Sequence, residues 1–179
     1  CADHPFDIRL QCEADAALVS ELHPDVIIVA TGAKPQLPPF ATEGNITAHD
    51  VLEEKVSIPG GNVAIIGGGM VGIETAEYLM ANARGPMMTT IIEMTDRIGA
   101  GMVPNNLVPT MQRLRQDGVQ LLVNTKVRRV TANSIEVESN GTVRPLSGHP
   151  PLVYATGVSA QAALMSELEG MAALSCIRH

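Results

Sequence analysis

Three consecutive glycines, residues 67–69, join a short apolar run to a segment with helical periodicity. The run at 63–66 has the composition of a buried strand. The next segment, from about Met70 to Asn82, places Ile73, Ala76 and Met80 on one face, so that one side of a helix can pack on a sheet. A strand that turns directly into a helix is typical of parallel sheets. The feature therefore predicts an α/β fold with a parallel sheet and flanking helices.

The same glycines match a pattern with a physical purpose. Gly67, Gly69 and Gly72 form G-x-G-x-x-G between the strand and the helix. The first permits the sharp turn, the second lets a pyrophosphate approach the backbone, and the third lets the helix pack close to the strand. Unsatisfied N–H groups at the helix start favour an anion there. The alternative is a glycine-rich turn without a ligand. The residues expected to contact a dinucleotide here are Gly67, Gly68, Gly69, Met70, Val71 and Gly72.

An acidic residue, Glu93, lies at the end of the next predicted strand, which spans 87–94. Glu93 can accept hydrogen bonds from an adenosine ribose, at a spacing slightly longer than the usual one of about 20 residues. A carboxylate here would repel the 2′-phosphate of NADP, so NAD(H) is favoured over NADP(H). Arg97 is the one feature that favours NADP, and its alternative is a solvated loop arginine. Met94 joins Glu93 among the expected contacts.

Composition excludes several functions. Of 179 residues 45% are hydrophobic, yet there are only two Phe, two Tyr and no Trp, so the core must be aliphatic, as in parallel sheets. A net charge of −7 without a basic stripe argues against nucleic-acid binding. No apolar run approaches the roughly 18 residues of a membrane span. The three cysteines and five histidines form no metal-ligand pattern. A cytoplasmic location is expected.

The rest of the chain predicts further elements of such a fold. Residues 25–33 indicate a buried strand, the prolines at 35–39 an extended connection, 47–54 a short helix, and 119–123 a strand. A second helix is expected over 105–118, capped by Asn105 or Asn106, with Pro109 in its first turn. Its buried stripe would consist of Leu107, Met111 and Leu114. Beyond residue 125, three short alternating segments and the Asn140-Gly141 hairpin signal predict a small antiparallel meander.

Two similar turns flank this region. "IIVATGAKP" contains Ala30-Thr31-Gly32, and "LVYATGVSA" contains Ala155-Thr156-Gly157. Each is an apolar strand followed by Ala-Thr-Gly. The pair indicates two strands that enter and leave the same neighbouring structure.

These residues carry a family resemblance. "GGGMVGIETAEYLM", "TTIIEM", "NTKVRRV" and the paired ATG turns resemble the pyridine-nucleotide domain of flavoproteins with two dinucleotide-binding domains, over about 26–158. Within them the chain is most similar to the enoate reductase, 2,4-dienoyl-CoA reductase and NADH:flavin oxidoreductase group. The resemblance implies a Rossmann-like FAD/NAD(P)-binding fold, in which an NAD domain is inserted into an FAD domain and the ATG turns mark the two crossings.

The resemblance also implies roles and boundaries. Glu74 would face the nicotinamide end, although a carboxylate in the first turn of a helix is favourable without any ligand. Val127 would lie near the adenine. The implied contacts at the crossings are Ala30, Thr31, Gly32, Ala155, Thr156 and Gly157. The domains expected are 1–34, a remnant of the FAD domain with the first crossing; 35–61, a linker; 62–148, the NAD-binding domain; and 149–179, the return crossing with a further FAD-domain remnant.

Parts of the family pattern are absent from this sequence. It has no second G-x-G-x-x-G for FAD, no flavin-contacting Gly-Asp segment, no cluster cysteines and no barrel, and His149-Pro150-Pro151 replaces the usual aspartate before the second ATG. We therefore expect a fragment of a larger flavoenzyme. FAD would be bound mainly by the missing half, while FMN and a 4Fe–4S cluster would belong to the full-length protein.

The expected function is to bind NADH and pass its hydride to FAD, for reduction of an activated alkene or similar acceptor elsewhere in the enzyme. The fragment alone should be inactive, because no residue resembles a general acid, base or nucleophile. Three alternatives remain: a non-catalytic nucleotide-sensing module, a pyridine-nucleotide disulfide reductase-like domain, and an S-adenosylmethionine-dependent methyltransferase. The expected partners are the nucleotide, the rest of the flavoenzyme and a second copy of the chain, the last through exposed surface such as a helix at 162–174.

Overall fold

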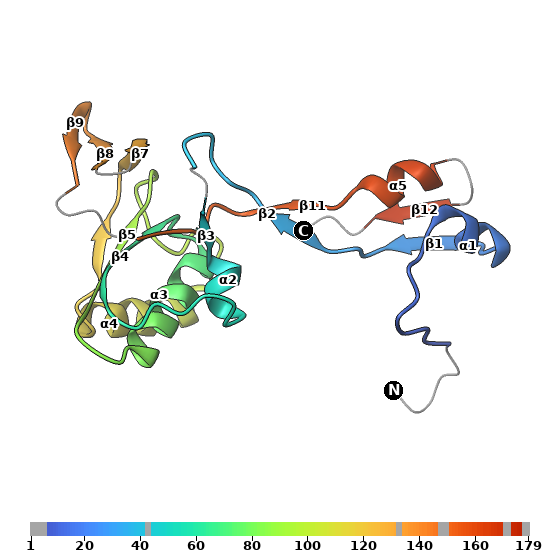
Figure 1. Ribbon diagram of the computed structural model, residues 1–179, viewed down its shortest axis with the longest axis horizontal. Coiled ribbons are helices and arrows are strands. Elements are labelled where there is room, and N and C mark those ends of the chain that lie inside the picture. The colour runs from blue at the N-terminus through green and yellow to red at the C-terminus, as the bar shows by residue number, and fades with distance from the viewer. Residues whose placement is uncertain (1–6, 42–43, 132–133, 147–150, 170–172, 177–179) are drawn as a thin grey trace. The chain divides into compact units, whose positions relative to one another are not determined.

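The computed structural model describes residues 7–41, 44–131, 134–146, 151–169 and 173–176 (Figure 1). The chain divides into two compact units. One contains residues 35–158, and the other combines 1–34 with 159–179. The boundary passes through two short strands that pair with each other, β2 (Ala33–Pro35) and β11 (Val158–Ala160).

The larger unit is built on a parallel sheet of five strands in the order β3-β10-β4-β5-β6. The strands are β3 (Ile46–Thr47), β4 (Gly61–Ile66), β5 (Met87–Ile92), β6 (Gln120–Leu122) and β10 (Leu152–Tyr154). All four pairs of neighbouring strands are parallel, with Ile65 opposite Ile91 between β4 and β5. The carboxyl ends of β10, β4 and β5 therefore meet at one edge of the sheet, which is where ligands bind in open α/β sheets.

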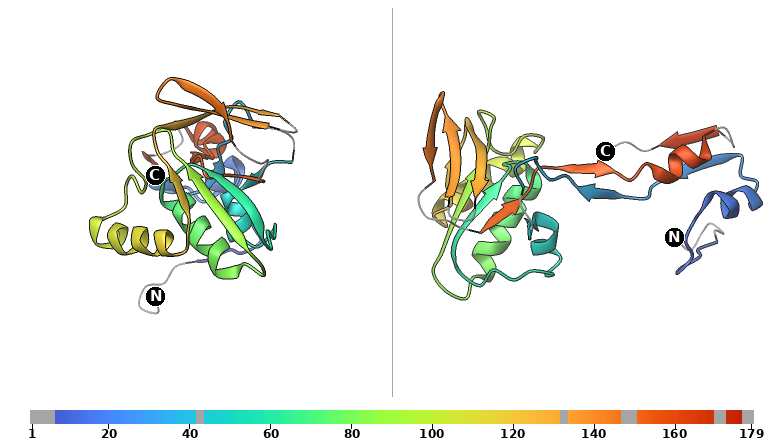
Figure 2. Two further views of the ribbon diagram at one scale, coloured as in Figure 1. Left: turned by 90° about the vertical axis from the view of Figure 1, so that its left-hand side faces the viewer. Right: turned by 45° about the horizontal axis from the view of Figure 1, so that its top comes forward.

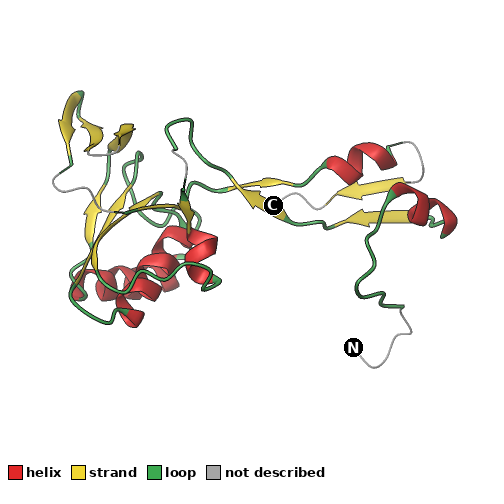
Figure 3. Ribbon diagram, viewed as in Figure 1, coloured by secondary structure: helices red, strands yellow, loops and turns green. Residues whose placement is uncertain are grey.

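Three helices cover one face of this sheet (Figure 3). They are α2 (Ala48–Leu52), α3 (Met70–Asn82) and α4 (Pro104–Gln116). Thr47 caps α2 in a reciprocal capping box with Asp50. The core beneath the helices is aliphatic, as the composition predicts, and includes Val63, Ile65 and Leu114. The predicted α3 boundaries are confirmed, although Leu79 is the buried residue at its end and Met80 is only partly buried.

A three-stranded antiparallel sheet covers the other face (Figure 2). It consists of β7 (Thr125–Thr131), β8 (Ser134–Ser139) and β9 (Thr142–Pro145). Its turn has positive φ at both Asn140 (52°) and Gly141 (76°), as a tight hairpin turn requires. The predicted meander is therefore confirmed, and both faces of the parallel sheet are buried, in a Rossmann-like FAD/NAD(P)-binding fold.

The smaller unit has a two-stranded parallel sheet, β1 (Val26–Val29) with β12 (Ala173–Cys176), and two short helices, α1 (Ala16–Glu21) and α5 (Ala163–Leu168). Ile27 and Val29 pack with Leu168, whereas Val26 and Ile28 are 57% and 65% exposed. The predicted strand is confirmed, but the prediction that it is buried holds for only one of its faces among the described residues.

Three further expectations are corrected by the structure. Neither Asn105 nor Asn106 caps α4, which begins at Pro104 after Val103 without a side-chain cap. Pro109 lies inside α4 rather than in its first turn. The helix expected over 162–174 ends at Leu168, and the chain returns as strand β12 because it pairs with β1. The proline pair at 150–151 lies partly outside the described residues.

Candidate functional site: a nucleotide cleft at the glycine turn

Backbone contacts explain two of the three motif glycines. Gly67 has φ +109°, and a Cβ on it would lie 2.3 Å from the carbonyl oxygen of Ala155. A Cβ on Gly72 would lie 2.1 Å from the carbonyl oxygen of Gly67. Real Cβ atoms do not approach backbone that closely, so any side chain would force the strand and the helix apart. These two glycines bring α3 close to the ends of β4 and β10.

Gly69 differs from them, because a Cβ built on it meets no atom within 4 Å. Its backbone is extended (φ −72°, ψ −174°) and is open to any residue. It is the N-cap of α3, where no side chain caps the helix and no acidic residue occupies the first turn. The helix therefore begins with unsatisfied N–H groups facing open space. Packing of the chain explains Gly67 and Gly72, whereas the space at Gly69 fits an anion that approaches the backbone.

Glu93 closes the other side of the turn. Its Oε2 accepts a hydrogen bond from the N–H of Gly68 at 2.7 Å, and its Oε1 accepts one from the N–H of Thr95 at 2.8 Å. Burial alone would raise the pKa of the Glu93 carboxyl, but hydrogen bonds from Gly68, Thr95 and Met94 outweigh it and hold the pKa below its usual value. The group is therefore a carboxylate at neutral pH.

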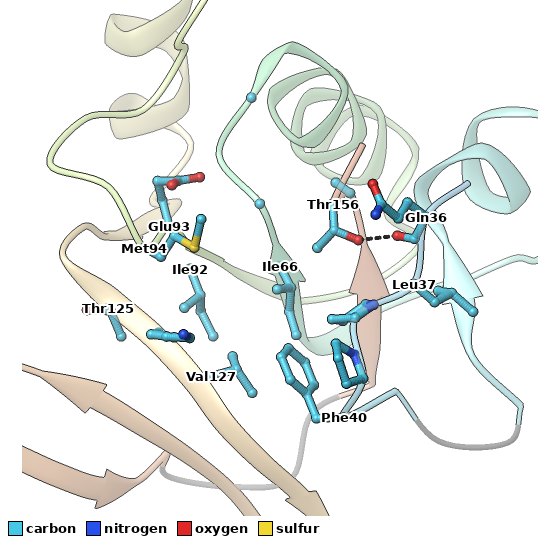
Figure 4. Close-up of a pocket in the computed structure, with 16 residues that line it drawn as sticks. Gln36, Leu37, Phe40, Ile66, Ile92, Glu93, Met94, Thr125, Val127 and Thr156 are labelled. Atoms are coloured by element: carbon cyan, nitrogen blue, oxygen red, sulfur yellow. Dashed lines mark hydrogen bonds between the residues drawn. The ribbon is translucent and has the colours of Figure 1, made fainter. Parts of the chain in front are cut away.

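A cavity of about 480 Å³ opens beside this turn, at the carboxyl ends of β4, β5 and β10 (Figure 4). Glycine residues 67 and 69 and the Glu93–Met94 pair line one side. The start of β7 and a proline-rich segment, residues 36–40, line the rest. The lining residues are Gln36, Leu37, Pro38, Pro39, Phe40, Ile66, Gly67, Gly69, Ile92, Glu93, Met94, Thr125, Lys126, Val127, Ala155 and Thr156.

The structure brings together part of the set expected from the sequence. The expected residues that line the cavity are Gly67, Gly69, Glu93, Met94, Val127, Ala155 and Thr156. Those that do not line it are Gly68, Met70, Val71, Gly72, Glu74, Arg97, Ala30, Thr31, Gly32 and Gly157. Among these, Glu74 is the fifth helical residue and is exposed, so it is not in the first turn as expected. Arg97 is also exposed, and its carbonyl accepts the hydroxyl of Thr95.

Sequence reasoning missed the proline-rich segment, which it treated as a connection only. Residues 36–40 form one wall of the cavity, and Phe40 packs against Tyr154 with ring centroids 6.4 Å apart. Thr125 and Lys126, next to the expected Val127, were missed as well. A usable signal was present: Phe40 is one of only two phenylalanines in the chain and directly follows two prolines.

Other kinds of site find no support in the described residues. There, no group of three or more His, Cys, Asp or Glu side chains is placed to hold a metal ion. No helix in this part of the chain is long and apolar enough to cross a membrane.

The chain belongs to the pyridine nucleotide-disulphide oxidoreductase family, whose family model matches residues 9–175. Members of this family bind FAD and a pyridine nucleotide, which agrees with the fold and with the cleft at the glycine turn.

Two curated proteins to which the chain is similar are named as oxidoreductases. Bilirubin reductase of Mediterraneibacter gnavus is 37% identical over 137 residues, covering 74% of this chain and 21% of its own length. NADH oxidase of Thermoanaerobacter brockii is 34% identical over 135 residues, covering 72% of this chain and 20% of its own. The solved structure of 2-naphthoyl-CoA reductase matches with a TM-score of 0.79 and 24% identity, over 94% of this chain and 26% of that one. The chain thus spans about a fifth of the length of these curated relatives.

Proposed function

We propose that residues 35–158 bind NADH as the pyridine-nucleotide part of a flavin-dependent oxidoreductase. The observation that carries the proposal is the opening at Gly69, where the helix starts without a side-chain cap and a Cβ would meet no atom of the described residues within 4 Å. An anionic pyrophosphate fits this position by charge and by size. Glycine residues 67–69 and the start of α3, Met70 and Val71, would hold it.

The two ends of the cavity suggest how the rest of the nucleotide is oriented. The Glu93 carboxylate can accept hydrogen bonds from the hydroxyls of the adenosine ribose, and its negative charge disfavours a 2′-phosphate, so NADH is preferred over NADPH. Met94, Thr125 and Val127 supply a largely apolar surface for the adenine. The nicotinamide would then lie toward Ala155 and Thr156.

Bound NADH supplies a hydride, and the protein contributes orientation. We propose that the acceptor is an FAD held mainly by parts of the enzyme outside this chain. Residues 1–34 and 149–179 would contribute to that flavin domain. The final acceptor would be an activated alkene or similar compound, as in the enoate reductase group, with any FMN or 4Fe–4S centre elsewhere in the full-length protein. The isolated chain should bind nucleotide without turning over.

Calorimetric titration of the chain with NADH up to millimolar concentration tests the proposal. Binding should be measurable and weakened about tenfold or more in Glu93→Ala. The matched control is Asp96→Ala, which removes an equal charge from an exposed residue outside the cavity. Absence of binding, or equal binding by wild type and Glu93→Ala, would refute it. A thermal shift with S-adenosylmethionine but not with NADH would favour the methyltransferase alternative.

A further inference from the structure

Two hydrogen bonds tie one wall of the cavity to the residues that follow β10, and Figure 4 shows the one between Thr156 and Gln36. The hydroxyl of Thr156 donates to the backbone carbonyl of Gln36 at 2.5 Å. The N–H of Gln36 donates to the carbonyl of Gly157 at 2.9 Å. The bonded residues are 120 positions apart in the chain, so the contact belongs to the fold rather than to a local turn. It fixes the first residue of the proline-rich segment.

The rest of this segment is stiff. Pro38 and Pro39 have fixed φ angles and no backbone donor, and the N–H of Ala41 closes a turn onto the carbonyl of Pro38 at 2.9 Å. Phe40 packs against Tyr154, the residue of β10 that comes two positions before Thr156. The wall is therefore held at one end by Thr156 and Gly157, which follow β10, and at the other by Tyr154 of β10, and its position depends on these two attachments.

The other ATG turn provides an internal comparison. The hydroxyl of Thr31 donates to the carbonyl of Gln161 at 2.8 Å, and the N–H of Gln161 donates to the carbonyl of Gly32 at 3.0 Å. The two pairs are reciprocal, because each glutamine follows the threonine of its own turn by five positions and bonds to the other turn. Thr31 and Gln161 line no part of the cavity, whereas Thr156 and Gln36 both do. Both ATG turns thus make the same pair of hydrogen bonds, but only the pair at Thr156 and Gln36 lies at the cavity.

We propose that Thr156 is a positioning residue for nucleotide binding, which holds the wall formed by residues 36–40 against the nicotinamide side of the cleft. This inference rests on the proposed function. The hydroxyl acts through the carbonyl of Gln36 and needs no contact with the nucleotide. Removing the hydroxyl loosens one end of the wall. NADH binding must then order the wall, and the free energy that this costs reduces the affinity for NADH.

The test compares Thr156→Val, which keeps the shape and loses the hydroxyl, with Thr156→Ser, which keeps the hydroxyl. Thr131→Val is the control, since it removes a threonine hydroxyl bonded to a carbonyl, that of Ser134, outside the cavity. We expect Thr156→Val to weaken NADH binding about fivefold and to speed amide exchange of Gln36 about tenfold without nucleotide. Thr156→Ser should restore both, and Thr131→Val should change neither.

The outcomes separate this inference from the proposed function. If the wild-type chain binds NADH and Thr156→Val binds it with the same affinity, the positioning role is overturned and the proposed function stands. Loss of affinity without faster exchange at Gln36 also overturns it, because the hydroxyl would then act on the nucleotide directly. If the wild-type chain does not bind NADH, both fall. Should Thr156→Val fail to fold, Thr156→Ala takes its place, with the same results expected.

Discussion

Strands β1 and β4 look alike in sequence and differ in the fold. Each is a short aliphatic run, and each is followed within a few residues by a glycine with positive φ, Gly32 (79°) or Gly67 (109°). In β4 the last four residues are all buried, because helices cover one face of the sheet and the meander covers the other. In β1 burial alternates, with Val26 and Ile28 exposed.

The cavity at the glycine turn is lined by residues of the larger unit. The end of β4 is held by close backbone contacts around Gly67 and Gly72, so the open position at Gly69 is fixed in space. The turn after β1 is much looser, since a Cβ on Gly32 would meet only the side-chain nitrogen of Gln161, at 4.0 Å. A binding site needs close backbone contacts of the kind found at Gly67 and Gly72 to hold its groups in place.

The largest difference is expected between alanine substitutions at the two turns. Gly67→Ala should destabilise the larger unit by about 3 kcal/mol or more, because the new Cβ would overlap the Ala155 carbonyl at an unfavourable φ. Gly32→Ala should cost about 1 kcal/mol, from backbone strain alone. Urea unfolding followed by far-UV circular dichroism measures both. Equal losses would show that the close contact at Gly67 has no energetic importance.

Alanine substitutions of one isoleucine in each strand should differ in their effect on the free energy of unfolding. Ile65→Ala in β4 removes a side chain that is completely buried, and should cost about 3 to 4 kcal/mol. Ile28→Ala in β1 removes one that is 65% exposed, and should change the stability of this chain by less than about 0.5 kcal/mol. Peptide-resolved hydrogen exchange with denaturant measures each unit by itself. A large loss in Ile28→Ala would mean that residues of this chain cover that face in solution.

Glu93 makes the stability of the larger unit depend on pH. Because its pKa is lowered by folding, its contribution is complete above the unfolded value of about 4.3 and is lost as the pH falls through the folded pKa. Glu93→Gln should therefore cost about 1.5 kcal/mol at pH 7. The gap between variant and wild type should narrow as the pH falls below the unfolded value and should close once the pH is below the lowered folded pKa. Urea midpoints from pH 3 to 7 measure it, and a constant gap would argue against the carboxylate as the cause.

Surface ion pairs should contribute least in either unit. Arg113 donates to Glu77 at 2.7 Å between α4 and α3, and also to the hydroxyl of Thr110. Arg113→Gln should lower stability by about 0.5 kcal/mol, and less in high salt. Arg9→Gln, which breaks the exposed pair with Asp7, should have no measurable effect. A loss above about 1 kcal/mol for Arg113→Gln would show that the pair holds the two helices together.

Local signals in the sequence determined most of the larger unit. The glycine turn, α3, the hairpin at Asn140-Gly141 and the acid after β5 each follow from a few adjacent residues, and the structure contains all of them. Aliphatic runs predicted the strands, but their exposure depends on what covers them, so the predicted burial was correct for β4 and held for only one face of β1.

The missed features depend on contacts between distant residues. β12 has a helix-like local sequence and forms a strand because β1 offers a partner. Residues 36–40 line the cavity, and Gln36 is hydrogen-bonded to Thr156, 120 positions away, and to Gly157. No pattern within the proline-rich segment encodes that bond, whereas the reciprocal threonine–glutamine spacing at the two ATG turns does hint at it.

An NMR titration of the nitrogen-15-labelled chain with NADH shows directly whether the nucleotide binds at the glycine turn. We expect the largest chemical-shift changes at the amides of residues 68–72 and 125–127, with little change in residues 8–29. Shifts concentrated in the smaller unit, or none at the glycine turn at saturating NADH, would contradict it.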